Sequence, residues 1–457
     1  MNPIDALKTN LPTDIAVLKS AGYLDDAQKL IDKWLTRPNL PQALRARLRV
    51  EKEILKDYAR EYPYPFDTAL AMVQKYVPDF TAEKLHELKD TGYADWILVD
   101  GAIHFQERFL ASMIKTHPDY AHIELDDEDG EATVDLSPVE ILENTLKEMK
   151  ETGHKAYYTR IRHHVTINPE AQELGKTLRV YLPLPQNQDQ ISNIEILEVS
   201  PKPLKIADDT YGQRTVCFEK PLEAGDVFIV EYAYENHAQY IDLDPAKVDD
   251  EQPNFETQEL VPHIVFTPYL KALAEEILGG ETNPLIKARK IYDWITTNVN
   301  YSYVREYINI ENIVDYAATN LKGDCGVQAL LFITLCRLSG IPAKWQSGMY
   351  ANPATLGNHD WAMFYVAPYG WLHCDCSFGG SGYRAKSDLR WNFYFGNLEP
   401  FRMSANSEFQ LDFDPPKKFL RADPYDNQRG ECEYEDRRLT FHDFTEDRKI
   451  VDIHPID

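Results

Sequence analysis

The chain has 457 residues, 43% hydrophobic and 27% charged, so it can bury the cores of a globular protein. At about 100–200 residues per domain, this length allows roughly two to four domains. The formal net charge of −26 repels phosphate backbones and anionic membrane surfaces, so we expect neither nucleic acid nor a membrane as a partner. Six cysteines are too few for a disulfide framework and fit a reducing compartment.

The start of the chain has no basic segment followed by an apolar one, so we expect no signal peptide. No run of about 18 apolar residues occurs, so we expect no membrane-spanning helix. Together with the cysteine content, these expectations predict a cytoplasmic protein.

Residues 1 to about 125 have the periodicity of helices, with apolar side chains three and four positions apart. The clearest segments are 25–35, 41–58 and 66–77. We expect the helical character to continue through the apolar stretch at 94–99.

A further helix is expected at 137–151, after an acidic run. That run, at 126–131, combines like charges with a glycine, which favours a solvated loop and a domain boundary. Ser137 and Glu140 have the spacing of a capping box, and Pro138 suits the first helical position.

The middle of the chain changes to short β-rich runs separated by turn residues, at 157–168, 177–184, 191–199, 215–218 and 226–234. Both faces of the last run are largely apolar, which predicts a central strand. Several strands at this spacing predict a β-sandwich.

A segment rich in Asp, Pro and Asn, at 242–255, separates the β-rich region from two more expected helices at 268–278 and 284–298. From residue 408 onward the chain is polar and contains Pro415-Pro416, so we expect a tail that wraps the body.

The segment that contains candidate catalytic residues begins at Asp324-Cys325-Gly326. Apolar residues follow at helical spacing, at Val327, Leu330, Leu331, Leu335 and Leu338. Asp324 is a good N-cap, while Gly340 and Pro342 predict the end of the helix. Cys325 therefore lies in a first turn, where free N–H groups and the helix dipole favour a thiolate and can also receive an oxyanion. Gly326 leaves room for a substrate carbonyl.

Three strands are expected after this helix. Residues 343–348 form the first, and 359–366 and 371–376 form a hairpin around Pro368-Tyr369-Gly370. A hairpin centred on Tyr369 places Met363 opposite Asp375. His359 then shares a face with Asp375 but lies four residues away, roughly 13 Å. A bulge, a slipped register or a bend must close this gap.

A cysteine, a histidine and an aspartate in this order suit acyl transfer. The thiol of Cys325 needs a base, and the imidazole of His359 serves near neutral pH. A carboxylate such as Asp375 fixes the tautomer of that base.

With these residues the sequence resembles the transglutaminase-like superfamily, in its bacterial multidomain form. The resemblance covers about 260–400 and rests on Ile291-Tyr292-Asp293-Trp294, Asn298, Tyr301, Gly323-Asp324-Cys325, Gly340-Ile341-Pro342-Ala343, His359-Asp360-Trp361, Gly370-Trp371 and Asp375. It implies an α+β fold with a papain-like core and the catalytic triad Cys325, His359 and Asp375.

The expected organisation has four parts, namely an N-terminal helical domain at 1–152, a β-sandwich domain at 153–245, a transglutaminase-like catalytic core at 256–410 and a C-terminal extension packed on the body at 411–457. Outside the triad, Tyr301 or Tyr303 supplies a hydroxyl to the oxyanion hole or simply packs. Trp361 is expected beside the triad.

Cys374 and Cys376 flank Asp375 where the family more often has apolar residues and a proline. We expect buried packing for both. A zinc site with His373 and a redox-sensing thiol pair are the alternatives. No metal or other cofactor is expected.

The predicted function is that of a cysteine peptidase or amidase, which hydrolyses a peptide or other amide substrate through a thioester. A protein-glutamine transglutaminase, which passes the acyl group to an amine, is the first alternative. A catalytically silent binding module is the second.

Overall fold

The computed structural model describes residues 3–120, 122–123, 125 and 137–456. The chain divides into two compact units that alternate along the sequence. The first gathers Met1–Gly130, Leu260–Val265 and Val299–Val327, and the second gathers Glu131–Glu259, Phe266–Asn298 and Gln328–Asp457. The N-terminal third therefore shares a unit with the segment that leads to Cys325. The predicted four-part division stays a prediction.

The first unit is largely helical. Its helices are α1 (Pro3–Ala6), α2 (Thr13–Ser20), α3 (Leu24–Leu35), α4 (Gln42–Tyr58), α5 (Phe66–Tyr76), α6 (Ala82–Asp90), α7 (Phe109–Thr116) and α11 (Ile313–Asn320), with a 3-10 turn, η3 (Tyr307–Asn309). The helices predicted at 25–35, 41–58 and 66–77 are confirmed as α3, α4 and α5. Their apolar stripes meet in buried clusters around Ile31 and Val73.

The helical prediction is wrong at 94–99. This stretch forms β2 (Trp96–Val99), which pairs with β3 (Ala102–Phe105) in a three-stranded sheet that also contains β1 (Tyr64–Pro65). The cause is the turn Asp100-Gly101, in which both residues have positive φ, of 48° and 82°. An Asp-Gly pair in that conformation makes a tight hairpin turn. The predicted acidic loop at 126–131 lies outside the described residues.

A buried polar network ties the N-terminal helices to the segment before Cys325. The carboxylate of Asp95 accepts hydrogen bonds from Tyr62 Oη at 2.7 Å and from Lys322 Nζ at 3.0 Å. Glu61 accepts from the backbone N–H of Glu306 at 2.6 Å. Buried polar groups with partners on both sides fix the geometry of the segments that they join.

Acid should destabilise the first unit through His263. This imidazole is buried, which lowers its pKa to about 3, and its Nδ1 accepts a hydrogen bond from the N–H of Ile313. The unfolded chain binds the proton near pH 6.5 and the native state does not, so stability falls as pH drops from 6.5 towards 3, by about 1.4 kcal/mol per pH unit. We expect denaturant melts of His263→Asn to lose part of this acid dependence, and an unchanged slope would contradict it.

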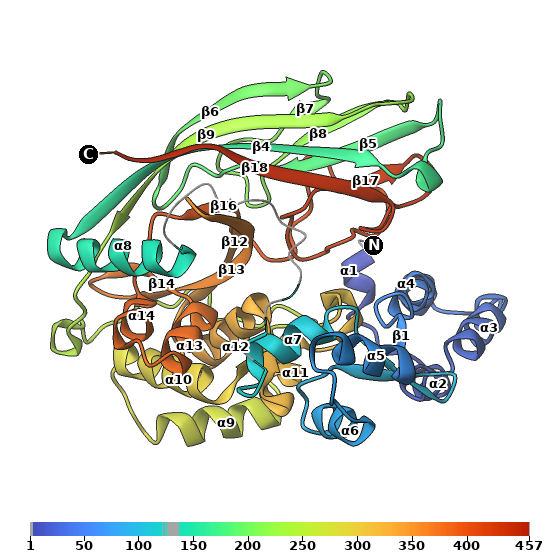
Figure 1. Cartoon of the computed structure of the whole chain (residues 1–457), viewed down its shortest axis with the longest axis horizontal. Helices are drawn as coiled ribbons and strands as arrows, with labels where there is room; N and C mark the ends of the chain where they lie inside the picture. Colours follow the sequence, from blue (N-terminus) through green and yellow to red (C-terminus); the bar gives the residue numbers. More distant parts are fainter. Residues whose placement is uncertain (1–2, 121, 124, 126–136, 457) are drawn as a thin grey trace. The chain divides into compact units, whose positions relative to one another are not determined.

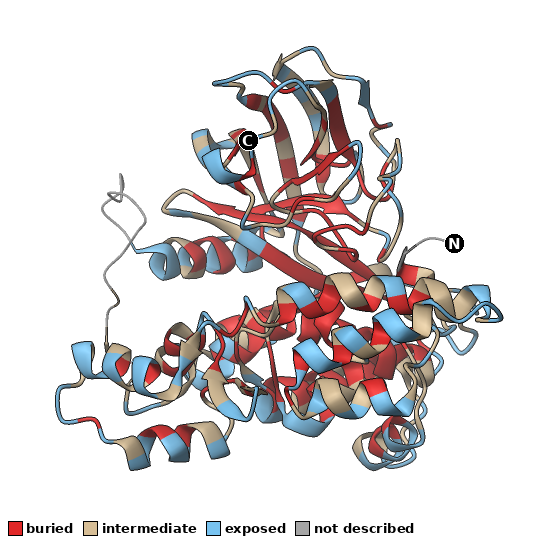
Figure 2. Ribbon diagram, turned by 90° about the vertical axis from the view of Figure 1, so that its right-hand side faces the viewer, coloured by how far each residue is buried: buried red, intermediate tan, exposed pale blue. Residues whose placement is uncertain are grey.

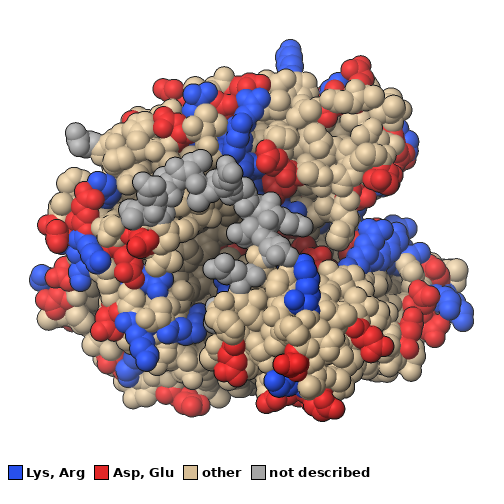
Figure 3. Space-filling model, in the orientation of Figure 1, with Lys and Arg blue, Asp and Glu red and all other residues tan. Residues whose placement is uncertain are grey.

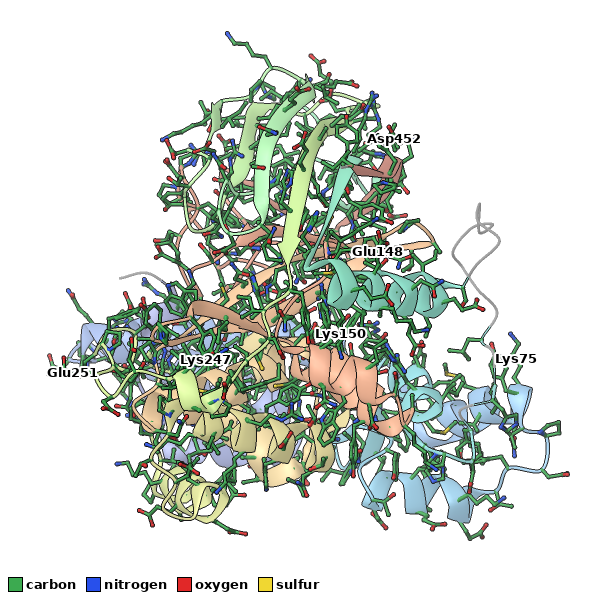
Figure 4. All side chains as sticks on the ribbon, turned by 90° about the vertical axis from the view of Figure 1, so that its left-hand side faces the viewer. Lys75, Glu148, Lys150, Lys247, Glu251 and Asp452 are labelled. Carbon is green, nitrogen blue, oxygen red and sulfur yellow. The ribbon has the colours of Figure 1, made fainter. Side chains whose placement is uncertain are left out.

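The second unit begins with α8 (Pro138–Thr152), where the predicted capping box is confirmed between Ser137 and Glu140. Figure 4 shows α8, with Glu148 on it, beneath the ends of the long strands that follow. The strands are β4 (His154–Ile167), β5 (Thr177–Pro183), β6 (Ile191–Ser200), β7 (Lys205–Ile206), β8 (Thr215–Pro221), β9 (Phe228–Gln239), β17 (Glu431–Tyr434) and β18 (Phe444–Ile456).

These strands form two antiparallel four-stranded sheets, in the orders β17-β5-β8-β7 and β18-β4-β9-β6. One buried cluster takes side chains from both sheets, such as Val165, Val180, Phe218 and Val230. β9 lies between β4 and β6, which confirms the prediction of a central strand. The last residues of the chain supply an edge strand to each sheet.

A five-stranded antiparallel sheet, in the order β15-β14-β13-β12-β16, carries the functional region of the second unit. Its strands are β12 (Ala343–Asn352), β13 (Thr355–Val366), β14 (Gly370–Cys374), β15 (Phe395–Gly396) and β16 (Arg402–Asn406). Within this unit, Figure 1 shows the sheet between the two four-stranded sheets and the helices α10, α12 and α13. Figure 2 shows buried residues along most of its strands.

The helices of the second unit are α9 (Pro268–Leu278), α10 (Pro284–Asn298), α13 (Cys376–Arg384), α14 (Asp388–Phe393) and most of α12 (Cys325–Leu338), with 3-10 turns η1 (Pro169–Ala171) and η2 (Pro245–Lys247). α9 and α10 have the predicted bounds. Among the described residues, none of the helices has the length and apolar character needed to cross a membrane.

Candidate active site

Cys325 is the first residue of α12, as predicted. The Oδ1 atom of Asp324 accepts a hydrogen bond from the N–H of Val327 at 3.1 Å and so caps the helix. The helix ends at Leu338, and Gly340 follows with φ of 81°. Of the six cysteines, Cys325 is half-buried and the other five are buried, so it is the one thiol with partial access to solvent.

Tyr301 lies beside the start of this helix, in the same unit. It is in the two-residue strand β10 (Asn300–Tyr301), which pairs with β11 (Lys322–Gly323) so that Tyr301 is level with Gly323. Burial raises the pKa of Tyr301 well above its usual range, and the neighbouring Cys325 and Asp324 raise it further. The phenol therefore keeps its proton at neutral pH and can donate a hydrogen bond.

Tyr303 stands edge-on to Tyr301, with 5.7 Å between the ring centroids. Its N–H donates to Ser112 Oγ of α7 at 3.0 Å. Gly326 is the second residue of α12. The oxyanion roles predicted for Tyr301, Tyr303 and Gly326 stay predictions.

His359 and Asp375 are brought together in the second unit. The Nε2 atom of His359, on β13, lies 2.7 Å from Oδ2 of Asp375. Asp375 follows β14 directly and caps α13, since its Oδ1 accepts from the N–H of Phe378 at 2.9 Å and from Ser377 Oγ at 3.0 Å. The carboxylate is therefore held on one side by a helix N-terminus while its other oxygen faces the imidazole.

A slipped register closes the gap that the sequence left open between these two residues. Met363 pairs with His373, not with Asp375, so the predicted pairing is wrong by two residues. Continued past Cys374, this register puts Asp375 level with Trp361, two residues from His359 on the same face. Diagonal neighbours at this spacing are within reach of long side chains.

A buried arginine and glutamate complete a chain of charges behind His359. Nη1 of Arg402 lies 3.0 Å from Asp375 Oδ2, the same oxygen that faces His359. Nε of Arg402 lies 2.6 Å from Oε1 of Glu399, and all four side chains of this chain are buried. Imidazole, carboxylate, guanidinium and carboxylate therefore alternate, so each charge has an opposite neighbour.

The electrostatics suit a base and its orienting group. Burial lowers the pKa of His359, and Arg402 lowers it further, whereas Asp375 opposes this shift. Burial alone would raise the pKa of Asp375, but His359 and Arg402 hold it well below its usual range. Asp375 is therefore an anion at neutral pH, and the histidine is a neutral base whose Nε2–H points at it.

Aromatic rings and one amide hold His359 in place. Its ring centroid lies 4.6 Å from that of Phe378 and 6.2 Å from that of Trp361. Any role of Trp361 toward the substrate stays a prediction. The indole N–H of Trp361 donates to Gln346 Oε1 at 2.6 Å. From the C-terminal segment, Gln428 donates to the carbonyl of His359 at 3.1 Å.

The sequence did not single out Glu399 or Gln428, and it gave Arg402 no role. A usable signal was the pair Glu399 and Arg402 in the apolar stretch Leu398-Glu399-Pro400-Phe401-Arg402, because buried opposite charges there need each other. Asn406, on strand β16, donates to Ser347 Oγ and to the Asn427 carbonyl, both at 3.0 Å.

Cys374 and Cys376 are buried, with 3.8 Å between their sulfur atoms. Burial raises the pKa of Cys374 well above its usual range, so it packs as a neutral thiol. Within the described part of the chain, no cluster of three or more His, Cys, Asp or Glu side chains is arranged to bind a metal ion.

Of the predicted triad, the structure thus joins His359 to Asp375 within the second unit and places Cys325 at a helix start in the first. The contact between the thiol and the imidazole stays a prediction.

Part of the chain is similar to known proteins. A family model described as the transglutaminase-like superfamily matches residues 271–376, which include α12 and both members of the His359–Asp375 pair. An uncharacterized protein of Haemophilus influenzae is 30% identical over 152 residues. That match covers 28% of this chain and 41% of the relative, so this chain spans less than half of the relative's length.

Two solved structures are similar at low identity. A "putative cysteine protease" from Cytophaga hutchinsonii is 15% identical, with 67% of this chain and 90% of that chain covered and a TM-score of 0.35. The periplasmic domain of TgpA from Pseudomonas aeruginosa is 17% identical, with 54% and 95% covered and a TM-score of 0.28.

Proposed function

Since residues 271–376 are a core of the transglutaminase-like superfamily, we propose that this protein is a cysteine-dependent acyl-transfer enzyme, a peptidase or amidase acting on a peptide or other amide. Cys325 is the nucleophile, His359 the base and Asp375 the orienting group. The observation that carries the proposal is the 2.7 Å hydrogen bond between His359 Nε2 and Asp375. Because this bond occupies Nε2, Nδ1 is the nitrogen that takes the proton of the thiol.

In the first half-reaction, His359 Nδ1 takes the proton of Cys325 and the thiolate sulfur attacks the amide carbonyl. A C–S bond forms, and the carbonyl oxygen becomes an oxyanion near the N–H groups at the start of α12. The C–N bond then breaks as the imidazolium gives its proton to the leaving amine. Asp375, kept anionic by Arg402, stabilises the imidazolium in between.

In the second half-reaction, a water molecule gives a proton to His359 and its oxygen attacks the thioester carbonyl. A C–O bond forms, the C–S bond breaks and the acid is released, while His359 returns the proton to the cysteine sulfur. An amine in place of water would give a new amide, which is the transglutaminase outcome.

The local fold supports a papain-like core. The helix that starts at Cys325 continues into the second unit, where Phe332 packs edge-on against Phe364 of β13, with 5.6 Å between centroids. β13 carries His359, and the next strand ends at Asp375. The order of cysteine helix, histidine strand and aspartate at the next strand end is that of papain-related enzymes, preceded here by the proposed β-sandwich.

Mass analysis of the products tests this function and separates its two outcomes. A set of peptide amides is incubated with the full chain, with and without a primary amine. We expect release of a free acid in both cases, with transfer to the amine a minor product. Products that depend on Cys325 but consist mainly of the amine adduct would favour transamidation, and no Cys325-dependent product would reject the proposal.

A further inference from the structure

Two cations lie against the two tyrosines that precede Cys325. The guanidinium carbon of Arg108 is 3.2 Å from the ring centroid of Tyr303. The Nζ atom of Lys115 is 4.5 Å from the ring centroid of Tyr301 and 3.3 Å from the hydroxyl oxygen of Tyr303. Both residues come from the N-terminal part of the first unit, Arg108 just before α7 and Lys115 on it.

The tyrosines hold the cations in defined positions. Stacking on a ring face fixes the guanidinium plane and leaves its edge N–H groups directed outward. Lys115 donates one hydrogen bond to Tyr303 and retains two further donors. Ser112, also on α7, anchors the backbone of Tyr303 at 3.0 Å. A pair of cations fixed in this way loses little side-chain freedom when it binds an anion.

This pair is close to the nucleophile. Tyr301 is level with Gly323, two residues before Cys325, and the N–H of Ser302 donates to the Gly323 carbonyl at 3.1 Å. Burial raises the pKa of Tyr301 and of Asp324, and the positive charge of Arg108 opposes the shift in both. All of these residues belong to the first unit.

Neither of these two cations has a carboxylate counterion in contact with it among the described residues. Arg108 and Lys115 are exposed, and within 3–120, 122–123, 125 and 137–456 neither side chain forms an ion pair with a carboxylate. The nearby acid, Asp324, is occupied, because its Oδ1 accepts from Tyr307 Oη at 2.5 Å and from the N–H of Val327.

We propose that Arg108 and Lys115 form a carboxylate subsite beside Cys325, so that the preferred substrate is an acidic peptide or amide with a carboxylate near its reacting carbonyl. The inference rests on the proposed function and adds the substrate class. Arginine and lysine provide the charge-assisted donors that a carboxylate needs, and the proximity of Tyr301 to the cysteine sets where that carboxylate lies.

The net charge of −26 does not oppose an acidic substrate at this place. At physiological salt the screening length is about 8 Å, so acids farther away on the surface have little effect there. On the face drawn in Figure 3, acidic and basic side chains are interspersed, so the net charge does not give the sign of the local field. Arg108 and Lys115, which form no ion pair with the described residues, therefore set the local preference for a carboxylate.

Alkylation of Cys325 by a matched pair of reagents measures this field directly. Both iodoacetate and iodoacetamide alkylate the same sulfur, but iodoacetate contains a carboxylate where iodoacetamide has a neutral amide. The quantity measured is the rate of alkylation by iodoacetate divided by the rate by iodoacetamide, both at Cys325 of the full chain. We expect this ratio to be about tenfold lower in the double variant Arg108→Gln, Lys115→Gln than in the native chain. In the native chain we expect the ratio to fall as salt is added. A ratio that the double variant leaves unchanged would overturn the inference.

Lys75 offers a matched control in the same unit. Its Nζ lies 5.1 Å from the ring centroid of Tyr76 and 3.5 Å from its hydroxyl, much as Lys115 lies against Tyr303. Figure 4 labels Lys75 among the N-terminal helices. Lys75→Gln should leave the ratio unchanged, and Lys115→Arg, which keeps the charge, should preserve it.

A substrate pair then tests the class itself. For peptide amides that differ only in Glu against Gln beside the scissile bond, we expect kcat/KM to favour Glu at least about tenfold, about 1.4 kcal/mol. The preference should disappear in the Arg108→Gln, Lys115→Gln variant, and an equal or reversed preference in the native chain would contradict the subsite. If the proposed enzymatic function fails, neither peptide is turned over, but the alkylation ratio can still be measured. If only the carboxylate subsite fails, both peptides are turned over without a preference for Glu.

Discussion

Replacing Cys325 with serine should abolish amide turnover, with kcat/KM falling on the order of 10⁴-fold or more, equivalent to about 5 kcal/mol of transition-state stabilisation. The reason is that a hydroxyl beside a neutral imidazole is a far weaker nucleophile than a thiolate, and the rest of the site is built for sulfur. Steady-state kinetics on peptide amides, with folding checked by circular dichroism, measure the effect.

Cys336 provides the matched control, because it lies on the same helix and is fully buried. Cys336→Ala removes a thiol from the core without touching the proposed chemistry, so kcat/KM should stay within about threefold while stability falls by about 1 kcal/mol. Equal losses in the two variants would show that the cysteines act through the fold. Full activity in Cys325→Ser would remove the nucleophile from the proposal.

The second large effect is expected at Arg402. Arg402→Met leaves Asp375 and Glu399 buried without their shared counterion, and breaking a buried ion pair from one side costs about 3–5 kcal/mol. Chemical denaturation should therefore show a large loss of the free energy of unfolding. Because Asp375 has a lowered pKa in the native state, it stabilises the fold at pH values above the pKa of the carboxyl in the unfolded chain. This stabilisation is lost as the pH falls below that pKa, so the variant, which lacks much of it, should lose less stability in acid.

The same change should move catalysis along the pH axis. Arg402 lowers the pKa of His359, so its removal raises that pKa and shifts the pH optimum of kcat/KM upward. Glu399 raises the pKa of His359, so Glu399→Gln, which keeps the contact between Arg402 and Asp375, should not shift the optimum upward. A Met variant with the native denaturation midpoint and pH profile would mean that Arg402 does not act on the His359–Asp375 pair.

Local signals predicted much of the fold. Asp324 and Gly340 bounded α12, Ser137 and Glu140 bounded α8, and the apolar spacing gave α9 and α10 their observed limits. Each of these elements is set by residues within a few positions of its ends, so a single sequence contains the information.

The pairing of strands that lie far apart in the sequence could not be predicted. β17 joins β5 by pairing Glu433 with Arg179, and β18 joins β4 by pairing Phe444 with Ile167. Nothing near these residues specifies partners more than 200 positions away, so the tail could be predicted only as a segment on the body. At 96–105, the apolar residues led to the prediction of a helix, although Asp100-Gly101 is a turn signal and the structure has a hairpin there.

For the site, residue types and order predicted the His359–Asp375 contact, but the register that makes it possible came from the structure. The hairpin closes at Val366 and Gly370, and this two-residue shift brings the carboxylate within reach. Arg402 and Gln428 lie far along the chain from His359 and are joined to it only by folding. The carboxylate subsite likewise depends on α7, about 200 residues before Cys325.

The central claim is that His359 activates Cys325, and the pH dependence of carboxamidomethylation at Cys325 tests it most directly. With peptide mapping to separate the six thiols, the account predicts that Cys325 reacts at pH 6.5 within about tenfold of its rate at pH 9, and that His359→Gln removes this fast labelling at low pH. An ordinary thiol near pKa 8.5 would lose roughly a hundredfold over that range. A profile of that ordinary kind, identical with and without the imidazole, would contradict the account.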